Sequence, residues 1–211
     1  TLALAHLVGP GGRVVGIDFD PEMIELAHER TRAAGLEDRV THQVGDATSL
    51  PFPDNTFDAS RSERLFQHLD NPAAALGEMI RVTRPGGRIV VFDTDHETVA
   101  VDMPDPDLWY RLQGVRVNHL MTNARSGRQL FRLFREAGLH DVQAEPRALA
   151  SLDYGVAKVA GSLDKVETSA IELGVVTSEE MERLRSWLER ASANGKFFCC
   201  WTMVLASGTK A

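Results

Sequence analysis

The chain has 211 residues, 43% of them hydrophobic, and this length fits one α/β domain with a sizeable core. Its formal charge of −7 argues against a long nucleic-acid interface, because phosphate binding requires clustered lysine and arginine. No apolar stretch is long enough to span a bilayer and no signal peptide opens the chain, so we expect a cytoplasmic protein without a membrane partner.

Strands and helices alternate along the first half of the chain. Residues 1–9 resemble the end of a helix, and residues 13–18 form a short β-branched segment that predicts a buried strand. Residues 21–35 open with proline and end with glycine, a pattern typical of a helix. Two strands, a helix and another strand are then predicted at 39–46, 56–62, 72–83 and 88–95. This order predicts a mostly parallel sheet with helices on both faces.

The second half continues the pattern with two additions. A helix is predicted at 125–138, a strand at 139–149 and a last, apolar strand at 197–207. Segments 96–125 and 150–195, the second largely helical, are insertions into the alternation. Because such insertions vary the scaffold above the strand ends, we expect substrate specificity to depend on them.

Polar residues stand at the carboxyl ends of the predicted strands, where ligands bind in open parallel sheets. A carboxylate at Asp18 is suited to the two hydroxyls of a ribose, and one at Asp46 could accept from an exocyclic amine. A nucleoside would satisfy both residues. The alternative is that each aspartate only caps the turn or helix that follows it.

Three segments carry a resemblance to a known family: GIDFDPEMIELA, VGDATSLPFPDNTFD and HLDNPAAALGEMIRVTRPGGRIVV. In this order and spacing they resemble the class I S-adenosylmethionine-dependent methyltransferases, in the small-molecule branch related to ubiquinone and menaquinone biosynthesis enzymes. The resemblance covers the chain from Thr1 to about Val142. It implies a doubly wound, Rossmann-like sheet of seven strands, mostly parallel with an antiparallel last strand, in one methyltransferase domain over residues 1–211.

The resemblance also implies S-adenosylmethionine as cofactor. Within this family pattern, Asp18 would hold the ribose hydroxyls, Asp46 would accept from the adenine amino group, and Ser62 would lie near the methionine part. Phe19 and Met23 would lie beside the adenine, and the backbone of Ala47 would lie at the edge of the ring. The full set of implied cofactor residues is Asp18, Phe19, Met23, Asp46, Ala47 and Ser62.

One family feature is not in this sequence, namely the glycine-rich loop of the form D-x-G-x-G-x-G that follows the first strand. The sheet is therefore expected to lack its N-terminal, central strand and to have a gap at that place. We expect a strand and a glycine-rich turn just before Thr1 in the parent protein.

The catalytic residues are less well indicated by the sequence. Methyl transfer to a hydroxyl requires a base, and histidine is matched to neutral pH. His119 is the first candidate because it lies in the 96–125 insertion, and His68, after the strand at 56–62, is the second. The adjacent Cys199 and Cys200 point to opposite faces of a strand, and no cluster has metal-ligand spacing, so neither a disulfide nor a metal is expected.

The sequence thus predicts O-, N- or C-methylation of a small, partly hydrophobic molecule, as in natural-product or quinone biosynthesis. Two alternatives stay open: a catalytically silent module of methyltransferase fold that binds a partner, and an NAD(P)-dependent oxidoreductase. The expected partner is the small-molecule substrate, and a homodimer is allowed for.

Overall fold

The computed structural model describes residues 1–211, apart from the side chain of Ala160. Its N-terminal unit consists of α1 (Leu2–Leu7), β1 (Val14–Asp18), α2 (Pro21–Ala33) and β2 (Val40–Val44). The two strands are parallel, and Ala5, Val14 and Val40 form a small core between them and α1. The carboxylate of Asp20, the N-cap residue of α2, accepts from the backbone N–H of Glu22 at 2.9 Å, and Pro21 follows as the first residue of the helix.

The main sheet has four strands in the order β3-β4-β6-β5. Strands β3 and β4 are parallel, whereas β6 runs antiparallel to both β4 and β5. Helices α3 and α5 and the short helix η1 pack against it, around a sheet core that includes Phe66, Leu76, Ile89, Val91 and Phe134. The bounds are β3 (Phe57–Glu63), η1 (Phe66–His68), α3 (Pro72–Val82), β4 (Thr83–Val101), α5 (Ser126–Glu136), β5 (His140–Ser151) and β6 (Cys199–Thr209).

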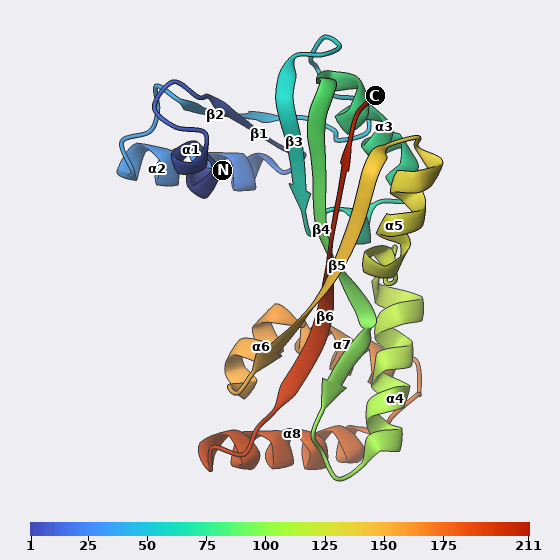
Figure 1. Cartoon of the computed structure of the whole chain (residues 1–211). Helices are drawn as coiled ribbons and strands as arrows, with labels where there is room; N and C mark the ends of the chain where they lie inside the picture. Colours follow the sequence, from blue (N-terminus) through green and yellow to red (C-terminus); the bar gives the residue numbers. More distant parts are fainter.

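The N-terminal unit stands beside β3 (Figure 1), but within the described residues its strands share no ladder with the main sheet. The division falls at the place where the resemblance predicts a gap. The segment after β2 is nevertheless fastened to α3. Glu78 accepts from the backbone N–H of Leu50 at 2.7 Å, and Arg81 donates to the carbonyls of Leu50 and Phe52 at 3.0 and 2.7 Å.

Strands β4, β5 and β6 continue past the sheet core into a second layer of helices, at the bottom of Figure 1. These helices are α4 (Pro106–Val115), η2 (Arg116–Leu120), α6 (Tyr154–Ala160), α7 (Leu163–Glu172) and α8 (Ser178–Ala193). Together they form a second core, the cavity core, which includes Leu112, Val166, Met181, Leu188 and Phe197. The two predicted insertions therefore meet in space.

The predicted α/β class, the element order and the antiparallel last strand are confirmed. The segment Pro85–Gly87, whose proline and two glycines are typical of a turn, instead belongs to β4, which bulges there because Gly86 has a φ of 75° and pairs with Lys210. The predicted helical segment 150–195 consists of the three helices α6, α7 and α8. Among the described residues, no helix combines the length and apolarity needed to cross a membrane.

Candidate functional site

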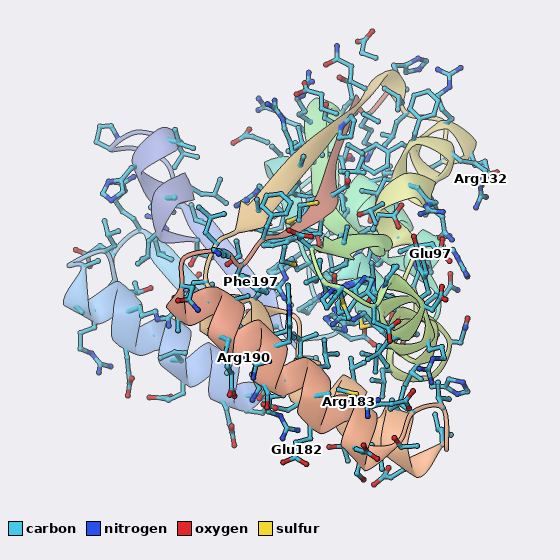
Figure 2. All side chains as sticks on the ribbon, turned by 90° about the horizontal axis from the view of Figure 1, so that it is seen from below. Glu97, Arg132, Glu182, Arg183, Arg190 and Phe197 are labelled. Carbon is cyan, nitrogen blue, oxygen red and sulfur yellow. The ribbon has the colours of Figure 1, made fainter. Side chains whose placement is uncertain are left out.

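A cavity of about 310 Å³ opens between the last residues of β3 and β4 and the cavity core. Its walls are mainly apolar and come from β4, α4, α8 and β6: they include Val99, Trp109, Leu188, Phe197 and Trp201. Figure 2 shows α8 from below, with Phe197 just beyond its end and the exposed Arg183 and Arg190 along the helix. The polar side chains that reach this cavity are few, as is typical of small-molecule sites.

A wide bulge in β4 forms one wall of the cavity. Asp95 pairs with Thr202 of β6 and Ala100 pairs with Cys200, so residues 96–99 lie opposite a single residue of β6. The hydroxyl of Thr98 closes the bulge, because it donates to the carbonyl of Asp95 at 2.7 Å and accepts from the Thr202 N–H at 2.8 Å. Bulges re-aim side chains, and both His96 and Val99 line the cavity.

Helix α4 holds the bulge from one side. The indole N–H of Trp109 donates to the carbonyl of Val99 at 3.0 Å. The Gln113 amide donates to the carbonyls of His96 and Val99 at 3.1 and 3.2 Å. These bonds satisfy carbonyls that the interrupted ladder leaves without strand partners.

Helix α5 holds the bulge from the other side through charged groups. Arg128 donates to the buried Asp95 at 2.8 Å and to Glu97 at 2.8 Å, and Arg125 donates to Glu97 at 2.6 Å. Glu97 is labelled in Figure 2. The hydrogen bond from Arg125, together with the charges of both arginines, lowers the pKa of Glu97, so this carboxylate stays ionised at neutral pH.

The imidazole of His96 is held by a chain of side chains. Gln67 Oε1 lies 2.9 Å from His96 Nε2, and Gln67 Nε2 lies 2.9 Å from His68 Nε2. Because an amide oxygen only accepts, Nε2 of His96 must carry the proton, which leaves Nδ1 with a free lone pair. This buried Nδ1 has no partner in the part of the chain that the structure describes. It is therefore available as a hydrogen-bond acceptor or a base.

A buried carboxylate positions this chain of side chains. Asp93, fully buried in β4, accepts from the backbone N–H of Phe66 at 2.7 Å and from the Ser126 hydroxyl at 2.9 Å. Its own backbone neighbour, the N–H of Thr94, donates to it at 2.9 Å. Burial raises the pKa of Asp93, and these hydrogen bonds oppose the rise. Asp93 thus ties η1, which carries Gln67, to β4 and to the start of α5.

Burial, with smaller effects from the Arg116 and Arg64 charges, lowers the pKa of His96 from 6.5 to about 4. Between these values the unfolded chain takes up a proton that the folded protein does not, so stability falls as pH decreases from 6.5 to 4. A shift of this size corresponds to a loss on the order of 3 kcal/mol.

We therefore expect His96→Gln to lose less stability than the parent protein between pH 6.5 and 4, as measured by urea unfolding. The matched control is His119→Gln, which replaces an exposed histidine and should keep the parent slope. Equal pH slopes for the parent and His96→Gln would contradict the assignment of the buried neutral imidazole.

The residues expected to bind adenosine at the end of β1 are accessible. Asp18 is exposed and accepts from the backbone N–H of Asp20 at 3.0 Å through Oδ1. Phe19 and Met23, 79% and 45% exposed, are large apolar side chains left open to solvent beside it. An open carboxylate next to apolar side chains fits a ribose and a base. Their role stays a prediction.

The other predicted cofactor residues follow β2 or lie in β3. Asp46 accepts from the Thr48 N–H and hydroxyl, both at 2.8 Å, so its carboxylate also makes the local turn that sequence reasoning left as an alternative. These bonds lower its pKa. Ala47 packs against the sheet core. The buried Ser62 Oγ has no hydrogen-bond partner within the described residues, which fits a group that awaits a ligand.

The structure places the two predicted catalytic histidines outside the cavity lining. His119 is exposed in η2, and His68 is exposed but contacts Gln67. The histidine that lines the cavity is His96, and the buried Arg116 lines it as well. His96 opens the 96–125 insertion, but the sequence alone gave no reason to rank it as a base. The signal was its place directly after the strand that ends in two aspartates.

Residues 1–91 match a family model described as a methyltransferase domain. The chain is 34% identical over 208 residues, 98% of its length, to an uncharacterised 37.1 kDa protein in transposon Tn4556 of Streptomyces fradiae. It is 33% identical over 161 residues to the demethylmenaquinone methyltransferase of Geobacillus stearothermophilus, which covers 69% of this chain and 68% of that enzyme.

The solved YcgJ protein of Bacillus subtilis superimposes with a TM-score of 0.59 at 22% identity, over 94% of this chain and 82% of that one. This likeness supports the fold. The chain spans 58% of the length of the Streptomyces protein. The class defined by fold and sequence is thus the Rossmann-like methyltransferases, and the chain belongs to the class I S-adenosylmethionine-dependent small-molecule methyltransferases.

Proposed function

We propose that this protein transfers the methyl group of S-adenosylmethionine to a small, partly hydrophobic molecule bound in the cavity. The observation that carries the proposal is the position of the cavity. Its wall begins at Glu63, directly after Ser62, and lies at the carboxyl ends of β3 and β4. In open α/β sheets this is the edge at which ligands bind.

The residues present fit the cofactor. Asp18 would accept from the ribose hydroxyls, Phe19 and Met23 would cover the adenine, and Asp46 would accept from its amino group, beside the backbone of Ala47. Ser62 would direct its unpartnered hydroxyl to the methionine part. When bound, S-adenosylmethionine supplies an electrophilic methyl group on a sulfonium.

The protein's own task is to place the acceptor and to exclude water. The apolar side chains of Trp109, Phe197 and Trp201 line the cavity and would exclude water from the acceptor. For an acceptor that must lose a proton, Nδ1 of His96 is the proposed proton acceptor, because it is buried, unpartnered in the described structure and aimed by Gln67. His68 reaches His96 only through Gln67. The assignment of His119 as the base stays a prediction.

We propose a single methyltransferase domain over residues 1–211 in which the cofactor side and the substrate side are built by different parts. The first half supplies the cofactor residues, and the two insertions at 96–125 and 150–195 supply most of the cavity core.

Calorimetric titration with S-adenosylhomocysteine and with NAD tests the proposal. We expect S-adenosylhomocysteine to bind and NAD not to bind. Binding of NAD alone would favour the oxidoreductase, and binding of neither would favour the silent module.

The variant Asp18→Ala tests the ribose contact. It removes two charge-assisted hydrogen bonds, each worth about 1.5 to 3 kcal/mol, so the affinity for S-adenosylhomocysteine should fall by one to several orders of magnitude. Asp38→Ala, at an exposed position in the turn before β2, is the control. Unchanged affinity in folded Asp18→Ala would remove the residue from the site.

Asp46 needs a graded pair of variants. Asp46→Asn keeps an oxygen that can accept from the adenine amine and should weaken calorimetric binding of S-adenosylhomocysteine modestly, whereas Asp46→Leu should weaken it more. Equal affinities for the parent and both variants would mean that Asp46 serves only its turn with Thr48.

A further inference from the structure

A buried arginine in the cavity is left without a counter-charge. Arg116 is 4% exposed and begins the single π-helical turn η2, directly after α4. Its Nε and Nη2 have no hydrogen-bond partner among the residues that the structure describes. The guanidinium lies against Gly161, where an added Cβ would stand 3.3 Å from Nη2. An unpaired charge in such a place is costly, and π-helical turns are frequent at functional sites.

The groups around Arg116 do not neutralise it. Burial raises the pKa of the Cys199 thiol to about 11 and that of the Tyr154 hydroxyl to about 12, so both are uncharged at neutral pH. His96 is uncharged there too. Glu63 also lines the cavity, but it pairs with Arg61 at the surface.

We propose that the molecule held in the cavity carries a carboxylate, bound by Nε and Nη2 of Arg116, on an apolar body. The two nitrogens lie on one side of the planar guanidinium, and this fork matches the two oxygens of a carboxylate. Only the statement that this acid is the methyl acceptor rests on the proposed function. The binding itself does not depend on methyl transfer.

A carboxylate suits the site better than a phosphate. One buried guanidinium balances one negative charge, whereas a phosphate monoester carries nearly two at neutral pH. The second charge would face the apolar walls formed by Val101, Leu188 and Met203. Arg64, which also lines the cavity, is exposed and could reach a second charge only at the surface.

The size of the cavity limits the apolar body. A cavity of about 150 Å³ lined by apolar side chains holds one benzene molecule. The cavity here has about 310 Å³, so a body of two fused rings, or an aliphatic one of similar volume, is the expected size.

Three naphthalene probes test the charge requirement by calorimetric titration of the protein at pH 7. They are 2-naphthoate, the uncharged 2-naphthamide and 2-naphthyl phosphate. We expect 2-naphthoate to bind about tenfold or more tightly than 2-naphthamide, as one to two charge-assisted hydrogen bonds predict. Equal affinities, or no binding of either probe, would overturn the proposal. Tightest binding of the phosphate would overturn the choice of a carboxylate.

Variants then identify the arginine responsible. Arg116→Met keeps the length of the side chain without its charge and should abolish the preference for 2-naphthoate. Arg132→Met, at an exposed arginine of α5 (Figure 2), makes the same change in net charge and should leave the preference intact. Loss of the preference in Arg64→Met with its retention in Arg116→Met would assign the anion to the surface and overturn the proposal.

A titration with S-adenosylhomocysteine on the same samples separates the two proposals. A preference for the carboxylate without cofactor binding would mean that the anion site stands and the methyltransferase proposal fails. Binding of S-adenosylhomocysteine without a preference for the carboxylate would mean that the methyltransferase proposal stands and the anion site fails. Because the parent protein alone gives the comparison of acid and amide, a poorly folding Arg116→Met would still leave the first test decisive.

Discussion

Replacing His96 with glutamine is expected to lower turnover about a hundred- to ten-thousand-fold for an acceptor that must lose a proton, the range typical of general-base catalysis. A glutamine amide can still donate to Gln67, but it has no basic lone pair to take the place of Nδ1. Affinity for S-adenosylhomocysteine should stay unchanged, because His96 belongs to the substrate cavity. Single-turnover rates and calorimetry on the same preparation measure the two quantities.

The other two histidines are the controls for this experiment. His119→Gln changes an exposed side chain outside the cavity lining and should leave turnover near the parent value. His68→Gln should have a smaller effect than His96→Gln, because His68 reaches His96 only through Gln67. A loss below tenfold in His96→Gln would indicate that positioning alone suffices, and a large loss only in His119→Gln would restore the histidine that sequence reasoning ranked first.

The second large effect is expected on stability, from Asp93→Ala. The substitution leaves the N–H groups of Phe66 and Thr94 without their acceptor at a fully buried position, and the hydroxyl of Ser126 keeps only its bond of 3.1 Å to the carbonyl of Thr94. Each unsatisfied buried donor costs about 1 to 3 kcal/mol, and the loss of a carboxylate that is itself costly to bury offsets part of the sum. We expect the free energy of unfolding to decrease by about 3 kcal/mol.

Urea unfolding at neutral pH measures this change, with Asp70→Ala, at an exposed position before α3, as control. Asp93→Asn should lose less stability than Asp93→Ala, because its amide oxygen still accepts one or two of the three bonds. A decrease under about 1 kcal/mol for Asp93→Ala would show that water replaces the carboxylate and that η1 is not held by it.

The order of elements was predictable because each carries its own local signal. Pro21 and Pro72 begin helices, and the apolar pattern of residues 197–207 marks the last strand, which the structure places at Cys199–Thr209. The same local reasoning fails for Pro85–Gly87. A proline and two glycines are typical of a turn, but here Lys210, directly after β6, pairs with Gly86 and Gly87 and extends the strand. A partner more than a hundred residues away leaves no trace in the local pattern.

The candidate site was predictable only where the resemblance covers the chain. The predicted cofactor residues, apart from Ser62, stand in the quoted segments, whereas most of the cavity core is built by contacts between the two insertions. His96 reaches the cavity because β4 bulges, and the bulge depends on Gln113 and Thr98. Arg116 would be expected on the solvent face of an amphipathic helix, and only the π-helical turn and the packing of Gly161 show that it is buried.

The two separate cores have a consequence for how such a protein can change its ligand. The sheet core lies among α3, α5 and the strands of the main sheet, and the cavity core lies among α4, α6, α7 and α8. Substitutions at cavity positions such as Val101, Trp109 or Leu188 therefore alter the shape of the ligand space without removing contacts from the sheet core. Directed evolution toward a different acid can draw its libraries from α4, α6, α7 and α8 alone and leave the main sheet with α3 and α5 unchanged.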